Sequence, residues 1–139
     1  MPRSTIARRD AGVFDKATEL RNQSNAALAA TTSETGVAIP EAKTALSFRC
    51  EVRVLAHTGY TAGTNQWSIA IEASDVLGSG YVPIKTIVPN GSMQTYVFDV
   101  RGYELDQLKP NAAFYRATAT KTGAPGNLTY GAFFTMLGA

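Results

Sequence analysis

Apolar and polar residues alternate along six stretches of this chain, and each stretch predicts a β-strand. The clearest is Leu46–Val54, in which apolar side chains at every second position alternate with Ser47, Arg49, Glu51 and Arg53. An alternation of period two places one set of side chains on a buried face and the other in solvent. The predicted strands are Leu46–Val54, Gln66–Ser74, Tyr81–Val88, Met93–Val100, Ala113–Thr120 and Leu128–Met136.

Turn-forming residues separate these strands at intervals of about 8–12 residues, which is typical of an antiparallel β-sandwich or small barrel. The pattern changes once, at Tyr103–Leu108, where Leu105 and Leu108 are spaced as in one helical turn that Pro110 ends. We predict an all-β fold, an antiparallel β-sandwich (jelly-roll or immunoglobulin-like), in which this turn leads from one sheet to the other. The expected core is Leu46, Phe48, Val52, Val54, Trp67, Ile69, Ile71, Ile84, Phe98, Val100, Tyr115, Tyr130 and Phe134.

The last two predicted strands are expected to form a hairpin. Ala113–Thr120 and Leu128–Met136 both alternate, and Gly123, Pro125 and Gly126 lie between them. Two alternating runs joined by a short Gly/Pro segment are the usual sequence pattern of an antiparallel hairpin.

The first forty residues lack this regularity. Asp10–Leu20 has apolar residues on one helical face, but Gly12 and the many Asn, Ser and Thr residues disfavour a helix, so we favour an extended arm. Such a segment cannot bury enough of its own surface to order itself, and we expect it to be mobile or to lie on a neighbouring subunit. Pro40 divides the arm, residues 1–40, from the sandwich, residues 41–139. The candidate interface residues in the arm are Arg8, Arg9, Val13, Phe14 and Leu20.

The composition narrows the possible partners. Charged residues make up 17% of the 139 residues, against roughly 25% in soluble domains, which suits a protein packed against others or a sandwich covered by Thr and Ser. A formal net charge of +2 is too small for a nucleic-acid-binding surface. No apolar run approaches the length of a membrane span or of a secretory signal, so we expect no membrane contact and synthesis inside a cell.

Residues for catalysis are scarce. Cys50 and His57 are the sole cysteine and histidine, which excludes an intrachain disulfide and multi-histidine metal sites. A Cys50–His57 nucleophilic pair is conceivable, but Cys50 lies on the inward face of its strand, where a thiol behaves as a small apolar group. The acidic pairs Glu72/Asp75 and Glu104/Asp106 fit no acid–base or calcium arrangement. We therefore expect no enzyme, no cofactor and no metal.

Two binding functions remain open. Tyr60, Trp67, Tyr81 and Tyr103 could stack on sugars, as in a carbohydrate-binding module, although Trp67 is in register with Ile69 and so is expected in the core.

Alternatively, the surface serves assembly. Arg116 lies in the middle of a Thr-lined strand face, and arginine is enriched in interfaces. Phe133 points to the face opposite Phe134, so that both sheet faces near the end of the chain carry apolar residues. We take Arg116 and Phe133 as further interface candidates.

Three segments resemble one class of proteins. The run YRATATKTGAPGNLTYGAFFTML resembles the C-terminal part of small tailed-phage virion proteins, with an Arg-containing strand, a Thr/Gly/Pro turn and a final YGAF-like strand. WSIAIEASDVLGSGYVPIKTI and AATTSETGVAIP resemble their central and N-terminal stretches, so that the resemblance covers most of Ala29–Leu137.

This resemblance implies a capsid decoration, or cement, protein. Such proteins bind the major capsid protein on the outer surface of the virion, often as dimers or trimers, and are made in the host cytoplasm. The long basic N-terminal segment departs from the pattern, which leaves open whether the arm lies on the capsid, on a sister subunit or inside the shell. A tail-tube or head–tail joining subunit is the remaining alternative of this kind.

Overall fold

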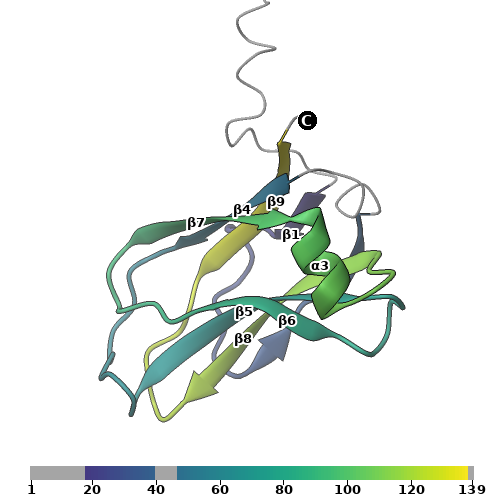
Figure 1. Cartoon of the computed structure of the whole chain (residues 1–139). Coiled ribbons are helices and arrows are strands. Elements are labelled where there is room, and N and C mark those ends of the chain that lie inside the picture. The colour runs from purple at the N-terminus through teal and green to yellow at the C-terminus, as the bar shows by residue number, and fades with distance from the viewer. Residues whose placement is uncertain (1–17, 40–46, 138–139) are drawn as a thin grey trace, which may run out of the picture.

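The computed structural model describes residues 18–39 and 47–137, with residues 47, 48, 136 and 137 described by their backbone alone. Two antiparallel sheets pack face to face (Figure 1), which confirms the predicted all-β sandwich. Sheet I has the order β1-β9-β4-β7, with the bounds Glu19–Arg21, Tyr130–Leu137, Ser47–Val54 and Gln94–Arg101. Sheet II has the order β2-β8-β5-β6, with the bounds Thr32–Ser33, Phe114–Thr122, Gln66–Ser74 and Val82–Ile87, and β3 (Val37–Ala38) also pairs with β8.

The period-two pattern locates the strands because each long strand buries one face between the sheets. In β5, Trp67, Ile69 and Ile71 are at most 1% exposed, while the residues between them are half-buried. Most predicted core residues are buried, and Ile84 and Phe98 are partly buried against the core. Leu46 and the side chain of Phe48 lie outside the described parts of the chain.

The predicted closing hairpin is wrong. β8 pairs with β5 in sheet II, whereas β9 pairs with β4 in sheet I, so the Gly/Pro segment crosses between the sheets. The inward faces of the two strands meet across the core, where the rings of Tyr115 and Phe134 pack edge to face with centroids 5.2 Å apart. Alternation identifies a strand and its buried face, but it does not identify the neighbouring strand.

The helical turn is where the sequence predicts it. α3, Gly102–Leu108, links β7 of sheet I to β8 of sheet II (Figure 1), with Leu105 fully buried. The backbone N–H of Arg101 donates to Glu104 Oε1 at 3.0 Å, which satisfies one donor at the start of the helix.

The N-terminal segment differs most from expectation. Residues 18–39 are extended, but they do not stand away from the sandwich: β1 pairs with β9, and β2 and β3 pair with β8. Leu20 and Ile39 bury their side chains in the same core as the long strands. These strands have two or three residues each, which is too short to produce a periodic pattern. Residues 1–17 and residue 40 of the expected arm lie outside the described residues.

Candidate functional site

On the outer face of sheet I, the strand register places side chains of neighbouring strands opposite one another. Because Cys50, Val52 and Val54 of β4 face the core, Arg49, Glu51 and Arg53 face outward. Arg49 lies opposite Asp99 of β7, and its Nε donates to Asp99 Oδ1 at 3.1 Å.

Arg53 lies at the centre of this face. Its register partners are Thr95 on β7 and Gly131 on β9. Its Nη2 is 3.3 Å from Glu51 Oε1, and its guanidinium carbon is 5.0 Å from the centroid of the Phe133 ring. The Arg53 side chain is 48% exposed, so one face of the guanidinium remains open to a partner.

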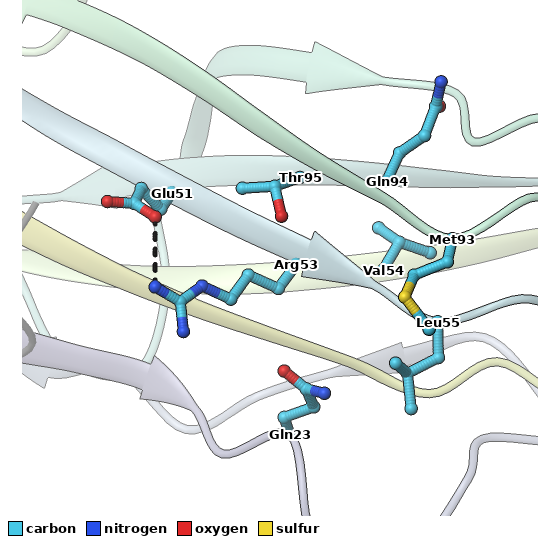
Figure 2. A pocket seen from close by; sticks show the side chains of 8 residues that line it. All are labelled: Gln23, Glu51, Arg53, Val54, Leu55, Met93, Gln94 and Thr95. Atoms are coloured by element: carbon cyan, nitrogen blue, oxygen red, sulfur yellow. Dashed lines mark hydrogen bonds and ion pairs between the residues drawn. The ribbon is translucent and has the colours of Figure 1, made fainter.

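A pocket of about 440 Å³ opens on this face around Arg53. Figure 2 shows Gln23 opposite Arg53, the Arg53–Glu51 ion pair, and Met93 beside Leu55 at the end of the pocket. A smaller pocket of about 120 Å³ shares Gln23 and Arg53 and continues toward Phe133. The two pockets form one shallow groove, which we call the sheet I groove.

Gly131 and the N-terminal segment form one wall of the sheet I groove. A side chain at Gly131 would meet the backbone N of Gln23 at 3.0 Å, so the close passage of Gln23 over β9 requires glycine there. Arg21 fixes this segment: its Nε and Nη2 donate to the carbonyls of Tyr130 and Ala26 at 3.1 and 2.8 Å. Its Nη1 also pairs with Glu34 at 2.7 Å, and the Arg21 side chain is only 3% exposed.

The opposite wall is formed by Met93 and by Gln94 and Thr95 at the start of the edge strand β7. Met93 is 68% exposed, and Val97, further along β7, is 52% exposed. Methionine and arginine are enriched at protein interfaces, and a polar pocket flanked by exposed apolar side chains is typical of a surface that binds another protein. The groove can supply hydrogen bonds, one open guanidinium and apolar contact area.

The described residues show no metal-binding cluster, since no three His, Cys, Asp or Glu side chains among them gather at one place. In the same part of the chain, no helix has the length and hydrophobicity that crossing a membrane requires.

The Arg116 side chain is already bound to other side chains of sheet II. The β5–β8 register places it opposite Glu72, and Arg116 Nε donates to Glu72 Oε1 at 2.7 Å. The Tyr81 ring packs over the guanidinium with 4.0 Å between the guanidinium carbon and the ring centroid. Glu72 also accepts a hydrogen bond from Thr118, so this carboxylate is a structural partner in sheet II.

The other interface candidates lie in different places. Leu20 is 5% exposed and Phe133 is 4% exposed, so neither offers much surface to a partner. Leu20 belongs to the core, and Phe133 faces outward beneath Arg53. Arg8, Arg9, Val13 and Phe14 lie outside the described residues.

The alternative sites are not assembled. Cys50 is fully buried, and burial raises the pKa of its thiol well above the usual value, so the thiolate required of a nucleophile is disfavoured. Trp67 is also fully buried, and its indole N–H donates to the Gly126 carbonyl at 2.8 Å.

The aromatic residues considered for sugar binding are separated. Tyr60 packs beside Gly91, just before β7, whereas Tyr103 follows the end of β7 in α3. Eight residues of β-strand span roughly 26 Å at about 3.3 Å per residue, so these two rings cannot share a stacking platform.

Gln23, Met93 and Arg21, which line the groove, and Val97, further along β7, were not identified from the sequence. Met93 and Val97 belong to a predicted strand, but the alternation alone does not show that these two apolar side chains stay uncovered. Nothing in the sequence near Arg21 or Gln23 indicates that they pack on β9.

No protein-family model matches the chain, and no curated protein matches it in sequence. Among solved structures, it is similar to one described as "Bacillus endospore appendages form a novel family of disulfide-linked pili", at 15% sequence identity, with a TM-score of 0.40 over 80% of this chain and 79% of that chain. A similarity of this size carries no argument about function.

Proposed function

We propose that this protein is a structural virion protein that decorates a capsid and stabilises it by burying surface against the major capsid protein. The observation that carries the proposal is the sheet I groove, in which the open guanidinium of Arg53 lies between the N-terminal segment and the exposed side chains of β7. The identity of the partner comes from the sequence resemblance to small tailed-phage virion proteins.

The physical basis of the activity is contact area. Full burial of an exposed apolar side chain contributes about 1.5–3 kcal/mol. Met93, at 68% exposure, is the largest such contribution available beside the groove. Arg53 adds specificity, since a planar guanidinium can bind a carboxylate or backbone carbonyl through two hydrogen bonds.

Co-sedimentation of the purified chain with expanded, undecorated capsids of the virus that encodes it tests the proposal. We expect saturable binding, weakened by about tenfold or more in Met93→Ser and in Arg53→Gln, because each loses more than about 1.4 kcal/mol of contact energy. Val76→Ser is the matched control, since Val76 is 48% exposed but lies in the β5–β6 turn of sheet II. Binding that is absent, or equally strong in all three variants, would contradict the proposal.

The N-terminal contribution is tested by removing residues 1–17 alone. A longer deletion would also remove β1, Arg21 and β2, which belong to the sandwich. Retained folding with weaker capsid binding would support an additional contact by residues 1–17. If the deletion leaves capsid binding unchanged, the whole contact with the capsid is made by residues after position 17.

A further inference from the structure

β7 differs from the other sheet edges in its length and regularity. It has eight residues, and all eight pair with β4 without a register shift. β6, the edge of sheet II, has six residues, contains Pro83 and Lys85, and carries a register shift against β5. β1 has three residues with a register shift, and β2 and β3 have two residues each.

These differences matter because an open strand edge readily pairs with another strand. Short edges, proline, charged side chains (above all lysine) and bulges are the usual features that prevent such pairing. The other four edge strands are short, bulged or contain proline, whereas β7 has only two charged residues, Asp99 and Arg101, toward its C-terminal end. In the described part of the chain, β7 pairs with β4 and with no other strand.

The side chains of β7 are complementary to a second copy of the same strand. We propose that two copies of the chain join edge to edge through antiparallel pairing of β7 with β7 about a two-fold axis at Val97, so that the two four-stranded sheets I become continuous. In this register Val97 lies opposite the partner's Val97, so that these two side chains, each 52% exposed, cover part of each other's apolar surface.

Charges on the outer face also agree with this register. Thr95 lies opposite the partner's Asp99, and Arg53 lies beside Thr95 on β4. Arg53 is then two strand spacings, roughly 9–10 Å between Cα atoms, from the partner's Asp99, which a long arginine side chain can reach. This contact can form twice by symmetry alongside the Arg49–Asp99 and Arg53–Glu51 pairs, because a guanidinium and a carboxylate each make several hydrogen bonds, and no like charges lie opposite each other.

The inner face contributes an aromatic pair. Tyr96 and Phe98 point toward the core side but remain half-buried because β7 is at the edge. Pairing about Val97 places Tyr96 opposite the partner's Phe98, twice, and cross-strand aromatic pairs are favourable. Pairing about Asp99 would instead place Asp99 opposite the partner's Asp99, and pairing about Phe98 would place Val97 opposite the partner's Asp99.

The inference does not depend on capsid binding, because the pairing uses one purified chain. Sedimentation equilibrium of the full-length protein should give twice the mass of the chain. Val97→Lys should give the mass of one chain, because the two lysines would face each other across the axis. Val76→Lys is the control and should remain dimeric, since Val76 has similar exposure and lies away from β7. Thermal unfolding of both variants checks that the sandwich is intact.

A cysteine at the two-fold axis tests the register. Residues directly opposite each other in an antiparallel pair have Cα atoms about 4.5–5.5 Å apart, within the range for a disulfide. Cys50 is fully buried and is the sole native cysteine, so it should not compete. Under mild oxidation, Val97→Cys should form a covalent dimer on a non-reducing gel, and Val76→Cys should not.

Two results would overturn the proposal. The first is a wild-type protein that stays monomeric at the highest soluble concentration. The second is a dimer that persists in the Val97→Lys variant and is not cross-linked in the Val97→Cys variant, because the interface would then lie elsewhere.

Discussion

Replacing Arg21 with alanine should destabilise the fold more than any other loss of a charged side chain in the described residues. The Arg21 side chain is 3% exposed and makes three polar contacts, to Glu34, to the Tyr130 carbonyl and to the Ala26 carbonyl. Its guanidinium carbon also lies 5.0 Å from the centroid of the Tyr130 ring. In the Arg21→Ala variant, the Glu34 carboxylate and the buried Tyr130 carbonyl would lose their partner.

The size of the stability loss depends on how far water can replace the hydrogen bonds that Arg21 made. Removing one partner of a buried ion pair costs about 3–5 kcal/mol. Glu34 is 16% exposed and Ala26 is exposed, so water can partly rehydrate both, whereas the carbonyl of the buried Tyr130 would lose its hydrogen bond from Arg21. We therefore expect a loss near the lower limit, about 3 kcal/mol in the free energy of unfolding.

Urea denaturation followed by the fluorescence of Trp67, the single tryptophan, measures this difference. Arg53→Ala is the matched control: its side chain is 48% exposed with one ion pair, so it should cost less than about 1 kcal/mol. Glu34→Gln keeps an acceptor for Arg21 and should cost about 1 kcal/mol. If Arg21→Ala costs no more than Arg53→Ala, Arg21 does not hold the N-terminal segment on the sandwich.

Three further predictions concern the same part of the molecule. Gly131→Ala should lower the free energy of unfolding by roughly 1–3 kcal/mol, because the new methyl group would force Gln23 away from β9. Gly78→Ala is the control, since its methyl group would contact nothing within 4 Å, and it should change stability little. Equal effects of the two substitutions would contradict the close approach of Gln23 to Gly131. Tyr130→Phe should leave stability unchanged or raise it by up to about 1 kcal/mol, because the buried Tyr130 hydroxyl has no hydrogen-bond partner in the described structure; a loss above about 2 kcal/mol by urea denaturation would be inconsistent with that. Burial raises the pKa of Tyr115 and of Tyr130 above the ordinary value near 10. Above that pH the unfolded chain releases protons that the folded chain keeps, so stability should fall as pH rises, and a flat profile would contradict this.

The strands could be predicted because each carries its own signal. Gln66–Ser74 is predicted with the bounds that β5 has, since the buried and half-buried positions of that strand alternate without interruption. The pairing of strands has no such local signal. β8 and β9 are neighbours in sequence, yet each pairs with a strand much earlier in the chain.

The candidate site could be predicted only in part. The outward face of β4, with Arg49, Glu51 and Arg53, follows from the alternation. The groove, however, requires Gln23 to lie over Gly131, and Arg21 holds that contact through a hydrogen bond to a residue 109 positions away. A contact between segments so distant in the chain leaves no periodic pattern in either of them.

The central claim is that this chain acts by lying on a larger assembly, and one measurement tests it most directly. Electron cryo-microscopy would compare particles made with the gene and without it. The account predicts additional density on the outer capsid surface that fits the sandwich, with the sheet I groove against the major capsid protein. Particles without such density, or density in the tail tube or at the head–tail junction, would contradict it.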